Sequence, residues 1–277
     1  MKSRSSLLNQ SPQVSLMQFQ QILVNEGVQN TEQLKEIAKQ TIKYLGGDGD
    51  ARNSLMYGQV LETRWYESLL TGTPDYSVYD ADYYLAELWA CWVIYSRRYL
   101  REMEKTTSLS PLGVLGDSNP SVIVDVGCGF GYTTASLKQL FPRARVYGTN
   151  LPNTLQYRVA SRMAEMYDFN LVPDVSFIPE RADLVFASEY FEHFPEPIAH
   201  LESIIDAINP KSWLIANAFT ARAIGHFTSY SVSGSQANGK MTSKAFANTL
   251  RSRGYEKVKT KLWNNRPSYW KEVTDDA

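Results

Sequence analysis

The stretch that decides the fold is Ser121-Val-Ile-Val-Asp-Val-Gly-Cys-Gly-Phe-Gly-Tyr-Thr-Thr134. Residues 122–126 are apolar or β-branched apart from Asp125, which predicts a strand buried on both faces of a parallel sheet. Glycines at alternate positions then indicate a sharp turn, because glycine lacks the Cβ atom that would obstruct a tight backbone or an approaching ligand. From Tyr132 a helical pattern begins and runs to Pro142. The stretch therefore predicts a strand, a glycine-rich loop and a helix.

A glycine loop at a helix N-terminus suits a nucleotide-like ligand, because unpaired N–H groups and the helix dipole point toward the ligand. A phosphate-binding P-loop would end in Gly-Lys-Ser or Gly-Lys-Thr, but the first lysine after this loop is Lys138. A dinucleotide fingerprint would have its third glycine where Tyr132 stands. The pattern Asp125-x-Gly-x-Gly-x-Gly131 instead resembles the first motif of class I S-adenosylmethionine-dependent methyltransferases.

This resemblance implies a Rossmann-like fold with S-adenosyl-L-methionine as the cofactor. In that family the carboxylate at the Asp125 position helps to hold the cationic amino-acid end of the cofactor. The family pattern also has Asp or Glu at the end of the second strand, to receive both ribose hydroxyls. This chain has Asn150 there, whose amide can accept one hydroxyl and donate to another oxygen. We expect the cofactor to be bound by Asp125, Gly127, Cys128, Gly129, Gly131, Tyr132, Thr133, Asn150, Leu151, Ser188 and Glu189.

The composition indicates a soluble globular protein, since 43% of its 277 residues are hydrophobic and 21% are charged. A net charge of −1 argues against a broad electrostatic grip on nucleic acid. The two cysteines offer neither a disulfide framework nor zinc-ligand spacing. No apolar run approaches the ~20 residues that span a bilayer, and the N-terminus lacks the pattern of a signal peptide. We therefore expect a cytoplasmic protein that has no membrane partner.

The turn-rich stretch 106–120 predicts a boundary between a helical, aromatic-rich cap region, residues 1–110, and a methyltransferase domain, residues 111–277. Helical spacing of apolar residues predicts cap helices within 14–24, over 31–45 and over about 80–105. The aromatic side chains of this region favour core packing, and they also offer stacking faces to a substrate. We further expect that these helices could join copies of the chain in an oligomer.

Downstream of the opening motif, alternating strand and helix patterns predict a doubly wound α/β fold. Its sheet is expected to be seven-stranded and mostly parallel, with a terminal antiparallel hairpin and the N-terminal helical cap beside it. A serine- and glycine-rich segment up to Lys240 is predicted to be a mobile loop. The remaining strands are expected at 144–149, 174–179, 183–188, 213–218, 255–263 and 268–273, and helices at 196–208 and 242–252.

A second group of polar residues lies in Ser188-Glu-Tyr-Phe-Glu-His-Phe-Pro195, at the end of the predicted fourth strand, where parallel sheets bind their ligands. If this segment turns into a helix, Glu189, Glu192 and His193 share one face. Two carboxylates and an imidazole can coordinate a divalent cation. Alternatively, His193 can act as a general base with a carboxylate, Glu192, orienting it.

The same run resembles the ubiquinone-biosynthesis O-methyltransferases and the small-RNA 3′-end 2′-O-methyltransferases. In the RNA enzymes, a Glu-x-x-Glu-His run binds magnesium together with a histidine from the loop after the next strand, and His226 occupies a comparable place. The resemblance thus implies a site for Mg²⁺ or another divalent cation. In the metal-free alternative, Glu189 borders the cofactor and Glu192-His193 caps the helix. His200, expected on a helix surface, receives no role. The implied metal ligands are Glu189, Glu192, His193 and His226.

We predict methyl transfer to a hydroxyl of a small polyhydroxylated or phenolic molecule, with His193 as general base and the cap region as a lid. The alternative acceptor is a ribose hydroxyl of RNA, which the near-neutral charge and the lack of a basic stripe disfavour. DNA base methylation is disfavoured because neither an Asn/Asp-Pro-Pro-Tyr motif nor a Pro-Cys nucleophile occurs. A third hypothesis is an inactive scaffold of methyltransferase fold, with Asn150 marking a lost cofactor site.

Overall fold

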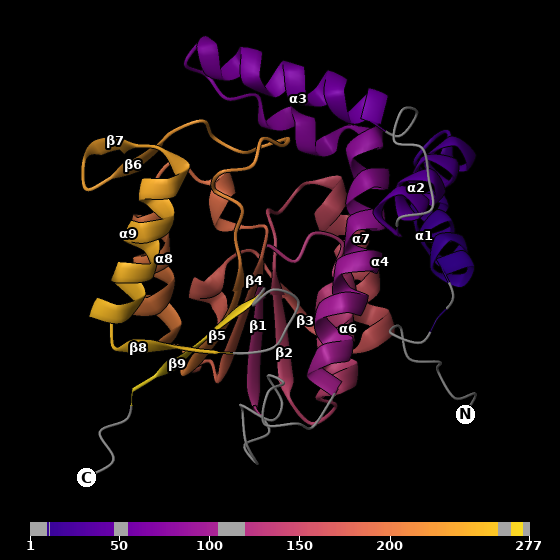
Figure 1. Cartoon of the computed structure of the whole chain (residues 1–277). Helices are drawn as coiled ribbons and strands as arrows, with labels where there is room; N and C mark the ends of the chain where they lie inside the picture. Colours follow the sequence, from indigo (N-terminus) through magenta and orange to yellow (C-terminus); the bar gives the residue numbers. More distant parts are fainter. Residues whose placement is uncertain (1–9, 11, 47–54, 105–119, 260–266, 274–277) are drawn as a thin grey trace.

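The computed structural model describes residues 10, 12–46, 55–104, 120–259 and 267–273 (Figure 1). Its main sheet has seven strands in the order β3-β2-β1-β4-β5-β9-β8. Strands β1 to β5 are parallel, and β9 runs antiparallel to both β5 and β8. The strands are β1 (Val122–Val126), β2 (Arg145–Thr149), β3 (Asn170–Val172), β4 (Leu184–Ser188), β5 (Ser212–Ala216), β8 (Tyr255–Val258) and β9 (Ser268–Glu272). This sheet confirms the predicted fold class.

Helices follow most of the parallel strands and also form the N-terminal region. The cap helices are α1 (Pro12–Asn25), α2 (Thr31–Gly46), α3 (Leu55–Leu70) and α4 (Asp82–Glu104), with the short 3-10 helix η2 (Tyr76–Asp80) between the last two. The sheet region carries α6 (Tyr132–Leu140), α7 (Leu155–Tyr167), α8 (Pro197–Ile208) and α9 (Gly239–Ser252), and the 3-10 helices η3 (Val175–Phe177) and η4 (Phe191–His193). No helix among these residues is long and apolar enough to cross a membrane.

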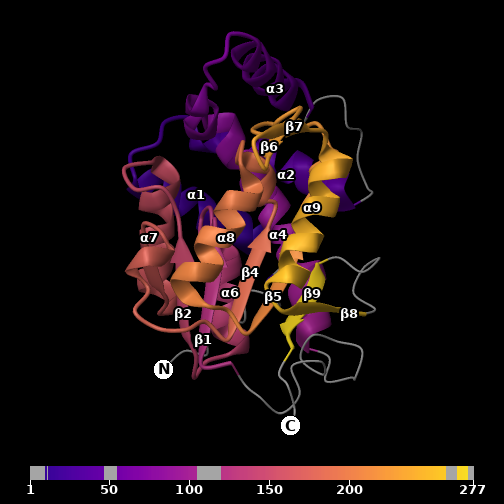
Figure 2. The same ribbon diagram turned by 90° about the vertical axis from the view of Figure 1, so that its left-hand side faces the viewer.

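The two faces of the sheet bury separate apolar clusters, because side chains alternate along each strand. Ile123 and Phe186 join a cluster with residues of α1, α2, α4, α6 and α7. Val124 and Val185, one position along, join a second cluster with residues of α8 and α9. Figures 1 and 2 show α8 and α9 on one side of the sheet and α4 and α6 on the other. The sheet is therefore the middle layer of three.

The cap helices pack directly on the sheet region. Phe19 of α1 stacks on Trp89 of α4 with ring centroids 4.4 Å apart, and it also contacts the ring of Phe130 in the glycine loop. Helix α3 crosses above the sheet (Figure 1), where Trp65 donates a 2.7 Å hydrogen bond to the carbonyl of His226. The domain boundary predicted at residue 110 lies outside the described residues.

Two predicted strands differ from the structure. The third strand is β3, at 170–172, and not 174–179, which contains η3 instead. The physical reason is the Asp174 side chain, which accepts a 2.7 Å hydrogen bond from the Ser176 amide and so stabilises a turn. The strand predicted over 255–263 ends at Val258 in β8, and its hairpin connection to β9 lies outside the described residues.

The serine- and glycine-rich segment predicted to be a mobile loop contains a hairpin. Strands β6 (Tyr230–Val232) and β7 (Ser235–Ala237) pair antiparallel around Ser233 and Gly234, which both have positive φ angles of 50° and 76°. Two consecutive residues with positive φ are what a tight two-residue hairpin turn requires. Helix α3 was also absent from the prediction, because its apolar residues are spread around the helix.

Candidate functional site

A cavity of about 1120 Å³ opens between the carboxyl ends of the parallel strands and the cap helices. The carboxyl edge of a parallel sheet is the usual place for ligands in this kind of fold. One end of the cavity, here called the loop end, is lined by Asp125, Gly127, Gly129, Thr133, Thr149, Asn150 and Leu151. The other end, here called the cap end, is lined by Glu62, Tyr76, Tyr79, Tyr84, Glu87, Cys91, Glu189, His193 and His226.

The glycine loop has a backbone that other residues rarely adopt. Gly127, Gly129 and Gly131 have φ angles of 66°, 51° and 77°. A Cβ atom at Gly127 would lie 2.2 Å from the Tyr190 ring, and one at Gly129 would lie 2.7 Å from the Trp92 ring. Both the left-handed backbone and the close ring contacts therefore require glycine here.

Asp125 lies at the end of β1 and is buried. Its Oδ2 atom accepts a 2.6 Å hydrogen bond from the Thr134 hydroxyl. Burial raises the pKa of Asp125 to about 7, and the Thr134 hydrogen bond acts in the opposite direction. A cation bound beside this carboxylate would favour its ionised form and lower its pKa. Asp125 is thus suited to hold an ammonium group.

Asn150 fastens the glycine loop to the end of β2. Its Nδ2 atom donates a 2.7 Å hydrogen bond to the Gly129 carbonyl, and its Oδ1 atom accepts one of 2.7 Å from the Leu151 amide. A carboxylate could accept the second bond, but it has no hydrogen to donate to the first. The amide retains one further donor and one further acceptor site for a ligand. Asparagine at this position therefore has a structural role in the loop.

The predicted cofactor residues fall into two groups. Eight of them line the cavity: Asp125, Gly127, Gly129, Thr133, Asn150, Leu151, Ser188 and Glu189. The other three, Cys128, Gly131 and Tyr132, do not line it. Cys128 is buried beneath Gly148, and Tyr132 packs edge-on against Trp89 with ring centroids 5.5 Å apart. The side chains of Cys128 and Tyr132 therefore hold the loop in place by packing and do not line the cavity.

The segment after β4 does not form the helix that would place Glu189, Glu192 and His193 on one face. Glu189 has a φ angle of 50°, and its amide donates a 2.7 Å hydrogen bond to the carbonyl of Ala216. This left-handed residue interrupts a helix, so only the single turn η4 follows. Strained non-glycine residues of this kind gather at ligand sites, because the surrounding structure must hold them in place.

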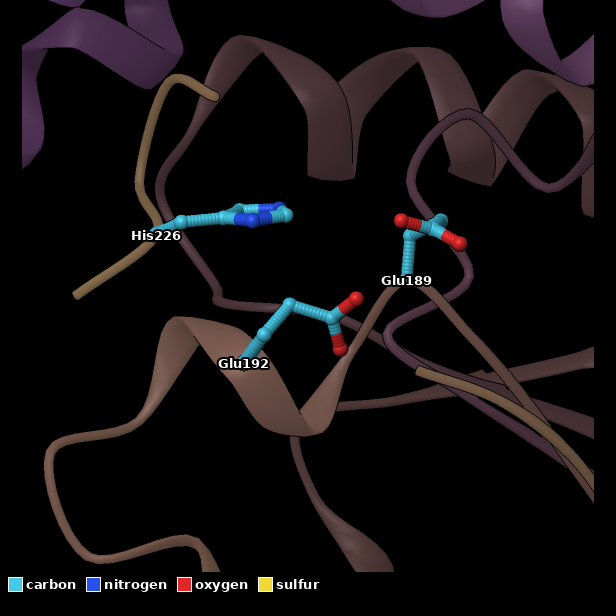
Figure 3. A group of neighbouring side chains, drawn as sticks. All are labelled: Glu189, Glu192 and His226. Atoms are coloured by element: carbon cyan, nitrogen blue, oxygen red, sulfur yellow. The ribbon is translucent and has the colours of Figure 1, made fainter. Parts of the chain in front are cut away.

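Three side chains still converge: Glu189, Glu192 and His226 offer ligand atoms that all lie within 4.8 Å of one another (Figure 3). Glu192 is fully buried, and its Oε1 atom accepts a 2.7 Å hydrogen bond from the Ala218 amide. Its Oε2 atom is buried without a hydrogen-bond partner among the described residues. Burial, followed by the charge of Glu189, raises the pKa of Glu192 well above its usual range. A cation here would take the place of the proton.

His226 is oriented to complete such a group. Its Nδ1 atom lies 2.9 Å from the carbonyl oxygen of Ala221, which can only accept, so Nδ1 carries the proton. The Nε2 lone pair therefore remains available to a metal, and hydrogen bonding of the other ring nitrogen is the common way to orient a metal-binding histidine. The donor set of two carboxylates and one imidazole fits a divalent cation.

His193 stands beside this group and is not among its three members. Its Nδ1 atom lies 2.9 Å from the Tyr79 hydroxyl, and its ring meets that of His226 edge-on at 4.9 Å. Burial, followed by the neighbouring His226, lowers the pKa of His193 to about 3. The imidazole is therefore neutral at physiological pH. Gly225 makes this contact possible, because a Cβ atom there would lie 1.8 Å from the Tyr79 hydroxyl.

Sequence reasoning missed Tyr79 and assigned His200 wrongly. Tyr79 was one of many aromatic residues in its region, and no local pattern links it to a histidine 114 positions away. His200 is half-buried; its Nε2 atom lies 2.9 Å from the Tyr190 hydroxyl, and its ring stacks on Phe194 at 3.9 Å. The helical pattern around His200 gave no sign of these contacts, because both partners, Tyr190 and Phe194, precede helix α8.

Comparison with known proteins gives a family match and several distant relatives. A family model described as "Methyltransferase domain" matches residues 79–260. A malonyl-[acyl-carrier protein] O-methyltransferase of Hahella chejuensis is 28% identical over 131 residues, which cover 45% of this chain and 46% of that protein. A trans-aconitate 2-methyltransferase of Rhodopseudomonas palustris is 27% identical over 101 residues, covering 33% and 36%. The matches thus span less than half of these relatives' lengths.

Solved structures resemble the chain at low identity. An O-methyltransferase from neocarzinostatin biosynthesis, solved with S-adenosylmethionine and 2-hydroxy-5-methyl naphthoic acid, has a TM-score of 0.47 and 14% identity, covering 79% of this chain and 69% of its own. An O-methyltransferase family protein from Burkholderia thailandensis has a TM-score of 0.44 and 14% identity, covering 79% and 71%.

Proposed function

The chain belongs to the methyltransferase-domain family, and from that premise we propose that it transfers a methyl group from S-adenosyl-L-methionine to a hydroxyl of a small polyhydroxylated or phenolic molecule. The observation that carries this proposal is one continuous cavity with Asp125 and the glycine loop at its loop end and His193 at its cap end. A donor and an acceptor can therefore meet within a single cavity.

The loop end fits this cofactor. Asp125 offers a buried carboxylate to the cofactor's ammonium group, Gly127 and Gly129 leave the backbone open to it, and Asn150 keeps one donor and one acceptor site for the ribose. When bound, S-adenosylmethionine supplies a methyl group that its sulfonium charge already activates. The chain has to align the acceptor oxygen, exclude water and remove a proton.

His193 is the base in this proposal, and Tyr79 positions it. The neutral imidazole can take a proton, and the Tyr79 hydroxyl beside Nδ1 fixes its orientation. The lowered pKa of His193 makes it a weak base. A weak base suffices, because an oxygen that is receiving a methyl group becomes strongly acidic as the new bond forms. In this arrangement Glu192 does not orient His193, contrary to the sequence-based hypothesis, since its Oε1 atom is bonded to the Ala218 amide.

A second candidate is metal-assisted methylation, favoured by the convergence of Glu189, Glu192 and His226. A divalent cation such as Mg²⁺ would be held by the two carboxylates and by Nε2 of His226, and it would lower the pKa of an acceptor hydroxyl. This candidate includes the ribose of RNA as an acceptor. The cavity lining argues against RNA, because Arg222 is the one lysine or arginine among its described residues, and a phosphate backbone attracts basic side chains.

The first experiment is incubation with methyl-labelled S-adenosylmethionine and separated small-molecule, RNA and protein fractions. We expect label in the small-molecule fraction and none with Asp125→Ala. Label in RNA alone would replace the first candidate by the alternative. Calorimetry with S-adenosylmethionine accompanies this assay, because an absence of binding would leave the inactive scaffold as the remaining hypothesis.

The second experiment tests the metal. Glu192→Gln keeps an oxygen that can accept from the Ala218 amide but loses the charge, so we expect it to abolish Mg²⁺ or Mn²⁺ binding in calorimetry without loss of fold. If the wild-type protein binds neither ion and EDTA leaves methyl transfer unchanged, the metal-assisted candidate is wrong.

A further inference from the structure

The cap end of the cavity is walled by carboxylates. Glu62 of α3 and Glu87 of α4 line it from the cap helices, and Asp80 lines it from the last position of η2. Glu87 is half-buried, and it makes no hydrogen bond or ion pair with the side chains that the structure describes. Its carboxylate lies against Gly58, where a Cβ atom would be 3.1 Å from Oε2, so α3 offers no side chain to cover it at that point. Burial, followed by the charge of Glu62, raises the pKa of Glu87. Glu87 is thus a carboxyl group that lines a ligand space and that a bound cation would favour in its ionised form.

Arg222, the one arginine among the described residues of the lining, is not available to Glu87. Nε of Arg222 lies 3.5 Å from Oε1 of Glu62, and its guanidinium lies over the Tyr66 ring, 4.3 Å from the centroid. It is therefore already engaged by an acid and an aromatic face. Neutralisation of Glu87 has to come from something else.

Further carboxyl groups lie at the same end of the cavity. Glu189 lines the cavity, and the neighbouring Glu192 is fully buried with an oxygen that lacks a hydrogen-bond partner among the described residues. Tyr84 and Cys91 lie on the same face of α4 as Glu87 and line the same cavity. Burial raises the pKa of each, and the charges of Glu87 and Glu189 raise it further. The carboxyl groups of α3, α4 and the segment after β4 therefore share one end of the cavity, where a bound cation would favour their ionised forms.

Aromatic rings accompany these acids. Tyr76, Tyr79 and Tyr84 line the same end of the cavity. Aromatic faces beside carboxylates attract an organic ammonium group through the ring quadrupole as well as through charge, and they repel a carboxylate. An acceptor that ended in a carboxylate would find one arginine, already engaged, and several acids.

We propose that the acceptor carries a protonated amine, which binds beside Glu87 among the rings of the cap end while its hydroxyl faces the loop end. This inference rests on the proposed function and narrows its substrate class to amine-bearing phenols or polyols. It excludes carboxylate acceptors, the class to which the named substrates of the two curated relatives, malonyl and trans-aconitate groups, belong.

The test uses three phenols of one shape and different charge: tyramine, para-ethylphenol and para-hydroxyphenylpropionate. Each is titrated calorimetrically into the full chain, with and without S-adenosyl-L-homocysteine. We expect tyramine to bind about tenfold more tightly than para-ethylphenol, as a charge-assisted contact allows, and the carboxylate to bind most weakly. Equal affinities, a preference for the carboxylate, or no binding of tyramine would overturn the proposal.

The variants Glu87→Gln and Glu67→Gln assign the effect to one residue. Glu87→Gln should reduce tyramine affinity about tenfold and leave para-ethylphenol unchanged; this second ligand also reports that the variant is folded. Glu67 is an exposed residue of α3 outside the cavity lining, so its substitution should change neither. If Glu87→Gln binds tyramine as the wild type does, Glu87 is not the amine site. Because the titrations without homocysteine do not need the cofactor, they separate this proposal from a failure of the proposed function.

Discussion

The two ends of the cavity are built in different ways. The loop end comes from one continuous strand, loop and helix, with Thr149 and Asn150 added by the next strand. The cap end is assembled from α3, η2, α4 and the loops that follow β4 and β5, and its Tyr79–His193 contact joins residues 114 positions apart. A ligand site can thus be local at one end and wholly tertiary at the other.

This difference has a physical origin. The loop end is fixed by backbone requirements, namely positive φ angles at glycines and hydrogen bonds between neighbouring elements, which leave a mark on the sequence. The cap end is fixed by packing of side chains from distant elements, and packing tolerates many residue types. We therefore expect a substitution at the cap end to reduce turnover without weakening cofactor binding, and a substitution at the loop end to weaken cofactor binding.

The variant His193→Ala is expected to give the largest difference between the effects on turnover and on cofactor affinity. Loss of the base should reduce turnover about a thousandfold, within the range for general base catalysis, while the affinity for S-adenosyl-L-homocysteine stays near that of the wild type. Steady-state methyl transfer and calorimetry measure the two quantities. A loss of cofactor affinity of the same size would show that the two ends are not independent.

Tyr79→Phe is the matched control for this variant. It removes only the hydroxyl that contacts Nδ1 of His193 and keeps the aromatic packing with Tyr76 and Tyr84. We expect a loss of turnover of about tenfold, the value of one hydrogen bond to the imidazole. A loss as large as that of His193→Ala would make Tyr79 the more important group.

Asp125→Ala addresses the loop end. Removal of the buried carboxylate should weaken S-adenosyl-L-homocysteine about a hundredfold, the cost of losing one partner of a buried charge pair. Calorimetry measures this, with Asp206→Ala as control, since that exposed aspartate of α8 pairs with Arg253 and lies outside the cavity lining. An unchanged dissociation constant for Asp125→Ala would refute the assignment of the loop end.

The difference between the loop end and the cap end also explains how much of the fold and of the site the sequence could predict. The family match confirms the assignment that rested on Asp125 and the three glycines, and the sheet confirms the fold class. The helix that was expected to place Glu189, Glu192 and His193 on one face does not form, and His226 was implied only by the resemblance to the RNA enzymes. In the structure Glu189, which has a left-handed backbone, and Glu192 lie close to His226, which the loop after β5 carries. Tyr79, Glu62 and Glu87 could not be assigned, because nothing in the sequence says which side of a cap helix will face a cavity.

The pH dependence of cofactor binding gives a graded test of Asp125. Its pKa of about 7 lies above the ordinary 3.8, so the free protein is protonated there below neutral pH. Affinity for an ammonium-bearing ligand should rise about tenfold per pH unit up to about 7 and then level off. His193, with a pKa of about 3, and His200, with one of about 4, do not titrate in this window. Affinity that does not vary with pH would contradict the raised pKa.

As the pH rises, the free energy of unfolding of the free protein should fall, whereas its affinity for the cofactor rises. A raised carboxyl pKa means that the folded state binds more protons than the unfolded state between pH 4 and 7, so the free energy of unfolding contributed by Asp125 is present at low pH and is lost as pH rises through 7. Asp125→Asn should remove this dependence from both measurements, while its amide can still accept from the Thr134 hydroxyl. A variant that keeps the wild-type pH profile would assign the titration to another group.

The smallest effect is expected from Asn150→Asp, which restores the acid of the family pattern. If the ribose contact alone decided this position, the variant would bind S-adenosyl-L-homocysteine more tightly. The structure favours the opposite result, because the carboxylate cannot donate to the Gly129 carbonyl and would place two acceptors 2.7 Å apart. We expect a loss of about 1 kcal/mol in the free energy of unfolding and an affinity about threefold weaker, since the loop that holds the cofactor is less well fixed. Denaturant unfolding and calorimetry measure the two changes, and a variant that is both as stable as the wild type and tighter in binding would show that Asn150 does not fasten the loop.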